Sequence, residues 1–244
     1  MKNGFIVSEV DLIFKECSMR NGFTLAEVLI TLGIIGIVAS MTLPALITRN
    51  QNKALEASLK KNYSVLQQAL DMYQAEHGER LKPEIIGIHE LKPAIIKYFS
   101  VLIDCGFGAK DADKACMAVY EVDNENYKGY YKTYNKNIMR LALLDDGQFI
   151  LKDGSTIFIE NFAENVVFIS VDVNGYRKNP NQWGHDLFTF QLMKDGSILP
   201  AGAPETLYNN KNTYCSATST NSYNGVGCTY YAINDKDYFN NLPR

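Results

Sequence analysis

The sequence lacks every short motif that marks the common catalytic and nucleotide-binding sites. It contains no GxSxG, no HExxH and no P-loop. Histidine is scarce, its three copies (His77, His89 and His185) are scattered, and no CxxC pair occurs. These absences exclude a recognisable zinc site, and we expect a protein that is not an enzyme.

Positive charge is also in short supply. Lys and Arg number 24 against 27 Asp and Glu, for a net charge of -3, which argues against a nucleic-acid partner. The mean hydropathy of -0.16 excludes a protein with many membrane spans. Hydrophobic residues make up 46% and charged residues 21%, so the 244 residues can fold as one domain with an appendage.

One long apolar run stands out, at residues 23–47, with Glu27 as its single charged side chain. As a helix it would be about 37 Å long, enough to cross a hydrocarbon core of about 30 Å. A secretory signal core is shorter, about 7–15 residues, and a buried helix would show a polar face. We therefore expect a transmembrane helix over residues 23–47.

Glu27 is the anomaly of this segment, because a carboxylate inside a span costs about 2.5–3.5 kcal/mol on insertion scales. It either lies shallow enough to reach water or has a partner of opposite charge. Cleavage just before Phe23 would create such a partner, an α-amino group four residues away.

These residues resemble the class III signal sequence of type IV pilins and type II secretion pseudopilins. Gly22, Phe23 and Glu27 are followed in register by Gly36 and Pro44. The resemblance implies cleavage after Gly22, methylation of Phe23, and assembly of a filament through the apolar helix, with Glu27 as the fifth mature residue. It also implies that Pro44 kinks the helix.

The resemblance further implies the partners and the location. The partners would be copies of the chain itself, other pilins or pseudopilins, a prepilin peptidase and an inner-membrane assembly platform. The chain would cross the inner membrane once, with its globular part outside the cytoplasm, and would then enter the pilus or pseudopilus filament. No nucleic acid is expected among the partners.

Residues 1–22 would be the leader, which is longer than usual and holds three basic and three acidic residues. The last four, Met19 to Gly22, would alone make a short leader of the familiar kind. We therefore expect that the true start is Met19 and that residues 1–18 reflect a misassigned start.

Beyond the span, apolar residues recur at helical spacing from Leu55 to Tyr73 and predict an amphipathic continuation of the helix over residues 48–78. Residues 79–244 would form a globular head. Alternating apolar residues and three Asp-Gly turns predict an antiparallel sheet at about residues 138–200, and residues 201–244 would be rich in loops. The fold class is α+β, a long N-terminal helix packed on an antiparallel sheet with disulfide-clamped loops, and this is a pilin-like architecture.

Cysteine occurs five times, and removal of the leader would remove Cys17. The remaining four, Cys105, Cys116, Cys215 and Cys228, allow three pairings. Pairing of the nearest neighbours would close two small loops, and export would supply an oxidising compartment. Reduced, buried thiols are the alternative. A Cys215–Cys228 bond would resemble the C-terminal disulfide-bounded region of type IV pilins.

The most marked polar loop contains Asp172, Asn174 and Asp186. Their oxygens suit a hard cation such as calcium, but the same residues are typical of turns, and both readings stay open. Trp183 would either plug the core under this loop or form an exposed contact. Asp145 and Asp146 precede Gly147, which predicts a solvated hairpin turn rather than an acid–base pair.

The function expected from these observations is that of a structural filament subunit. A different interpretation is a single-span, membrane-anchored periplasmic binding protein or enzyme, in which Gly22 and Glu27 would be incidental. The sequence does not distinguish a pilus from a pseudopilus.

Overall fold

The computed structural model describes residues 22–108, 114, 116–117, 131–162 and 165–243. The chain forms two compact units, Met1–Leu46 and Ile47–Arg244, which are described separately. Most of the expected leader, residues 1–21, lies outside the described residues.

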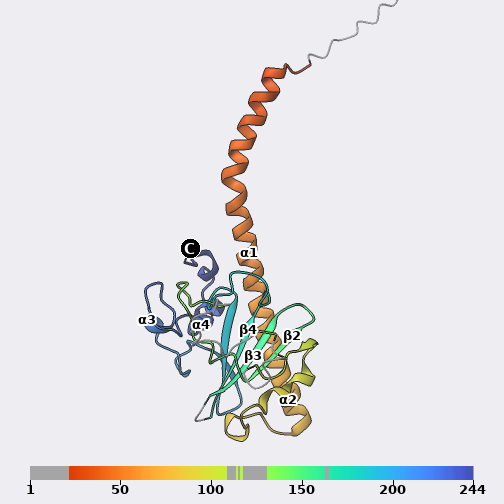
Figure 1. Cartoon of the computed structure of the whole chain (residues 1–244), viewed down its shortest axis with the longest axis vertical. Coiled ribbons are helices and arrows are strands. Elements are labelled where there is room, and N and C mark those ends of the chain that lie inside the picture. Colours follow the sequence, from red (N-terminus) through yellow and green to blue (C-terminus); the bar gives the residue numbers. More distant parts are fainter. Residues whose placement is uncertain (1–21, 109–113, 115, 118–130, 163–164, 244) are drawn as a thin grey trace, which may run out of the picture. The chain divides into compact units, whose positions relative to one another are not determined.

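One helix, α1 (Leu25–His77), runs through both the apolar run and its amphipathic continuation (Figure 1). Pro44 lies inside it without ending it. The helix stops at His77 because Gly78 adopts a left-handed φ of 78° and donates its N–H to the Gln74 carbonyl at 2.8 Å, a common C-terminal cap. The helix thus ends within one residue of the end expected for the amphipathic continuation, residues 48–78.

The α1 residues of the first unit form an apolar, exposed surface. The most apolar 18-residue stretch of α1 has a mean hydropathy of 2.2, and none of its residues is buried. By length and composition, α1 could therefore cross a membrane. Large aliphatic side chains such as Leu29 and Ile35 are exposed on this stretch.

The second unit contains a six-stranded antiparallel sheet in which each strand pairs with its neighbour in sequence. The strands are β1 (Val101–Asp104), β2 (Gly147–Leu151), β3 (Thr156–Phe162), β4 (Val166–Asp172), β5 (Leu187–Leu192) and β6 (Ile198–Pro200). Figure 1 shows β2, β3 and β4 side by side. The predicted α+β class is confirmed.

Both faces of the sheet are covered. One face carries Ile159 and Phe190, which join a core with Leu59 and Leu66 of α1. The other face carries Phe158 and belongs to a second core with aromatic and aliphatic groups from residues 131–144 and 183–226. Two-residue alternation along β3 therefore reflects burial on both faces.

Short helices complete the head. They are η1 (Pro83–Ile85), α2 (Leu91–Ile95), η2 (Ile96–Tyr98), α3 (Lys211–Tyr214), α4 (Cys228–Asn234) and η3 (Tyr238–Asn240). The last three interrupt the loops of residues 201–244. Two disulfides, Cys105–Cys116 and Cys215–Cys228, confirm the nearest-neighbour pairing.

The sheet differs from the prediction in two places. Strand β1 lies well before residue 138, where we expected the sheet to begin. The apolar run from Met139 to Leu144 forms no strand, although Met139, Leu141 and Leu144 are buried in the second core. Alternation there reflects burial of an irregular segment rather than strand pairing.

Two of the three Asp-Gly pairs form the predicted hairpin turns, and the third does not. Asp153-Gly154 joins β2 to β3 and Asp195-Gly196 joins β5 to β6, as predicted. Asp146-Gly147 is not a hairpin turn, because Gly147 begins β2 and the Asp146 N–H already donates to the Ile159 carbonyl at 2.9 Å.

Candidate functional site

The N-terminus of α1 is closed by a reciprocal cap between Thr24 and Glu27. The Glu27 carboxylate accepts hydrogen bonds from the Thr24 N–H at 2.8 Å and from the Thr24 hydroxyl at 2.9 Å, while the Glu27 N–H donates to that hydroxyl at 3.2 Å. This is a capping box, which satisfies N–H groups that a helix start leaves unpaired. Thr24 is not among the predicted site residues, although the Thr-x-x-Glu spacing is typical of such a box.

The other residues of the predicted processing and assembly motif lie nearby along the same unit. Gly22 and Phe23 precede the helix, and the Phe23 side chain is 87% exposed. Gly36 and Pro44 are both helical residues of α1. The cap therefore holds the Glu27 carboxylate against Thr24, which directly follows Phe23.

The loop between β4 and β5 brings together the three residues proposed as calcium ligands. Asp172 ends β4 and Asp186 precedes β5, and both carboxylates are fully buried. The charge of Asp186 acts on Asp172, and the Asn174 side chain lies close enough to Asp186 to lower its pKa. The three side chains thus form one cluster.

Protein donors already occupy this cluster. Asp172 accepts from the N–H groups of Asn174 and Gly175 at 3.2 and 2.7 Å and from the Tyr131 hydroxyl at 2.5 Å. Asp186 accepts from two further backbone N–H groups, those of residues 181 and 182, at 2.8 and 2.7 Å. Backbone N–H groups of the turns engage three of the four carboxylate oxygens, and the Tyr131 hydroxyl engages the fourth.

Burial decides the electrostatics of the pair. Removal from water raises the pKa of Asp172, and the neighbouring charge of Asp186 raises it further. Burial likewise raises the pKa of Asp186. Two buried carboxylates so close together therefore favour a state in which one of them keeps its proton.

Asp172→Asn is expected to flatten the pH dependence of the head's stability. A raised folded-state pKa means that the folded chain retains a proton that the unfolded chain, with an aspartate pKa of about 3.9, releases. That stabilisation is complete below about pH 4 and is lost as the pH rises through the folded pKa, at about 1.4 kcal/mol per unit of difference. Between about pH 5 and about pH 8, the Tm of the parent should fall by more than that of the variant, in EDTA.

His185 acts in the opposite direction and serves as an internal reference. Burial, and the charge of Lys136, lower the pKa of His185 to about 4. The contribution of His185 to the free energy of unfolding therefore rises with pH until the pH reaches the pKa of histidine in the unfolded chain. Because parent and variant share His185, the difference between their slopes reports on the Asp172–Asp186 pair alone. Equal slopes would contradict the assignment.

Trp183 lies in the same region and is fully buried. Its indole N–H donates to the Thr189 hydroxyl at 3.1 Å. Of the two possibilities for this residue, the structure supports the core plug and excludes the exposed contact.

Asp145 and Asp146 are not the solvated turn that the sequence predicts. Both are half-buried, and their carboxylates lie within 4.8 Å of that of Glu160, which comes from β3. Burial raises the pKa of Asp146, and burial together with Asp145 raises the pKa of Glu160. Sequence reasoning missed this group because strand pairing, not spacing along the chain, brings Glu160 to the two aspartates.

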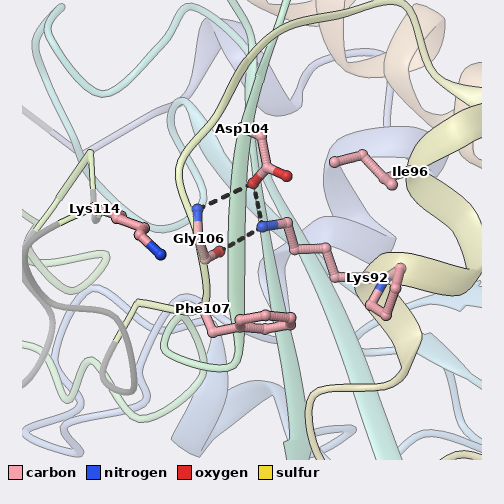
Figure 2. Close-up of a pocket in the computed structure, with 7 residues that line it drawn as sticks. Lys92, Ile96, Asp104, Gly106, Phe107 and Lys114 are labelled. Atoms are coloured by element: carbon pink, nitrogen blue, oxygen red, sulfur yellow. Dashed lines mark hydrogen bonds and ion pairs between the residues drawn. The ribbon is translucent and has the colours of Figure 1, made fainter.

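A pocket of about 520 Å³ opens beside α2 and the first disulfide loop (Figure 2). The buried ammonium of Lys92 forms an ion pair with Asp104, donates to the Gly106 carbonyl at 2.7 Å and lies 4.8 Å from the centre of the Phe107 ring. Lys114 lines the opposite side. The charge of Lys92 is thus already neutralised within the fold, and its role here is structural.

Comparison with known proteins bears on the N-terminal motif. A family model, described as the prokaryotic N-terminal methylation motif, matches residues 17–43. The match includes Gly22, Phe23, Glu27 and Gly36, and confirms the resemblance to a prepilin-type signal, consistent with the type IV pilin and pseudopilin family. The motif suggests a structural protein rather than an enzyme, and with the apolar helix it fits a single-pass inner-membrane anchor. Neither a curated protein nor a solved structure matches the chain.

Proposed function

We propose that this chain is a structural subunit of a type IV pilus-like or pseudopilus filament. A prepilin peptidase cleaves it after Gly22, Phe23 becomes the methylated first residue, and the apolar half of α1 packs against other subunits. The methylation motif at residues 17–43 carries this proposal. An apolar helix continuous with an α+β head supports it.

The capping box supports a specific role for Glu27. In the precursor, its carboxylate caps the first turn of α1 by accepting hydrogen bonds from Thr24. Cleavage would place a new positive charge on Phe23, and the same carboxylate would neutralise the amine of a neighbouring subunit. Neutralisation matters because an uncompensated charge is costly in a low-dielectric helix bundle.

The location and partners follow from the same proposal. The chain is first held in the inner membrane, with the head outside the cytoplasm. It then leaves the lipid as the assembly platform adds it to copies of itself or to related pilins. Packing between apolar helices replaces packing against lipid tails. The two disulfides suit the oxidising side of the membrane.

Mass spectrometry of the mature chain tests the proposal. We expect the N-terminal residue to be Phe23 carrying one methyl group, with residues 1–22 absent. An intact leader would overturn the proposal and would favour a membrane-anchored periplasmic binding protein or enzyme.

A matched pair of glycine variants sharpens the test. Gly22→Val should block cleavage, whereas Gly33→Ala should be cleaved normally. A Cβ at either position meets no other atom within 4 Å. Misfolding of the unit therefore does not explain a processing defect confined to the Gly22 variant.

A further inference from the structure

Three acidic side chains from two segments converge in the head. Asp145 and Asp146 precede β2, and Glu160 lies in β3. One oxygen of each carboxylate lies within 4.8 Å of the others. Oxygens that share a calcium ion at about 2.3–2.6 Å lie no more than about 5 Å apart, so these three are already spaced as ligands of one ion.

Glu160 shows that this is more than a surface cluster. Its side chain lies on the sheet face of the second core, and the residue is only 7% exposed. Its Oε2 atom is buried and has no hydrogen-bond partner in the described part of the chain. A buried carboxylate oxygen without a donor is costly, and in the absence of metal a proton shared with the neighbouring Asp145 carboxyl offsets that cost. A cation bound by both carboxylates would displace that proton and complete the same position.

The neighbouring groups hold the cluster in place. Asp146 accepts a hydrogen bond from the Asn161 N–H at 2.9 Å, and Nδ1 of His89 lies 3.3 Å from the other Asp146 oxygen. Hydrogen bonds of this kind orient metal-binding carboxylates. The cluster therefore has a supporting layer as well as three convergent oxygens.

We propose that Asp145, Asp146 and Glu160 bind one hard divalent cation, of which calcium is the best fit. All three converging groups are carboxylates, and oxygen-only ligand sets suit calcium rather than zinc or copper. The ion neutralises the repulsion among the three charges and supplies the missing partner of Oε2. It joins the start of β2 to the middle of β3.

This site is separate from the loop that contains Asp172 and Asp186. There, backbone N–H groups and a tyrosine hydroxyl already engage all four carboxylate oxygens. At Glu160, one buried oxygen is left without a donor. The inference is also independent of leader processing, because it concerns only the head.

Calcium titration of the full-length chain in detergent, after removal of metals with EDTA, tests the proposal. We expect one ion per chain by calorimetry, with a Kd of about 10⁻⁴–10⁻³ M, the range of extracellular calcium modules. Calcium should also raise the Tm, because it binds only the folded state. Absence of binding up to several times that concentration would overturn the proposal.

Variants locate the ion. Glu160→Gln and Asp145→Asn should each weaken calcium binding by at least about tenfold. Asp71 is an exposed aspartate on α1, and Asp71→Asn removes the same charge but should leave calcium binding unchanged. Asn174→Ala tests the rival loop. Loss of binding in Asn174→Ala with retention in Glu160→Gln would overturn the proposal. Should Glu160→Gln fail to fold, as judged by circular dichroism, the half-exposed Asp145 decides the question.

Discussion

Glu27→Ala is expected to leave cleavage after Gly22 intact and to reduce incorporation of the chain into filaments by at least about tenfold. An uncompensated charge in a low-dielectric interior costs about 3–5 kcal/mol, and about 1.4 kcal/mol already corresponds to a factor of ten. Without the carboxylate, the Phe23 amine of a neighbouring subunit would have no partner. The measurement compares the chain in sheared filaments with the chain left in the membrane.

Thr24→Ala is the matched control for this variant. It removes the hydroxyl of the capping box but keeps the Glu27 carboxylate, so it separates helix capping from charge neutralisation. Loss of an N-cap costs about 1 kcal/mol, and we expect incorporation to fall much less than for Glu27→Ala. If Glu27→Ala assembles as well as the parent, the neutralisation argument is wrong.

Phe190→Ala should lower the free energy of unfolding of the head by about 3–5 kcal/mol, the usual cost of deleting a fully buried phenylalanine ring. Phe190 is 0% exposed. Its ring stacks on Tyr63 of α1 at a centroid distance of 5.1 Å. The substitution therefore opens a cavity where α1 meets the sheet.

Denaturant unfolding of the full chain in detergent measures this loss. Trp183, the only tryptophan, is fully buried in the head and gives a local fluorescence signal. Leu102→Ala in β1 is the control, because this apolar side chain is 60% exposed and should cost little. A loss below about 1 kcal/mol for Phe190→Ala would contradict the packing described here.

The parts of the fold that follow from local chemistry were predictable. The stripe that contains Leu59 and Leu66 recurs at helical spacing, and both residues are buried against the sheet. The Asp153-Gly154 hairpin also follows from its own residues, since Gly154 adopts the positive φ that such turns require. Short loops likewise favoured the disulfide pairing that the structure contains.

The parts set by contacts distant in sequence were not predictable. Strand β1 has no alternating pattern, because Leu102, Ile103 and Asp104 are all exposed and the strand has a single partner, β2. The register of β3 brings Glu160 close to Asp145, and spacing along the chain does not reveal that register. The N-terminal motif is the opposite case, because Gly22, Phe23 and Glu27 lie close together along the chain and a motif match can detect them.

The order of the sheet also bears on how the head forms. Every strand pairs with the strand next to it in sequence, so each pairing closes a short stretch of chain, except that between β1 and β2, and such local contacts form rapidly. A chain that emerges N-terminus first can therefore complete the sheet as soon as Pro200 is available. Residues 201–244 follow this sheet along the chain and pack against it, for example where the Thr189 N–H donates to the Thr229 hydroxyl at 2.9 Å. The Cys215–Cys228 bond closes a loop within this last segment, so it joins only residues that follow the sheet in sequence.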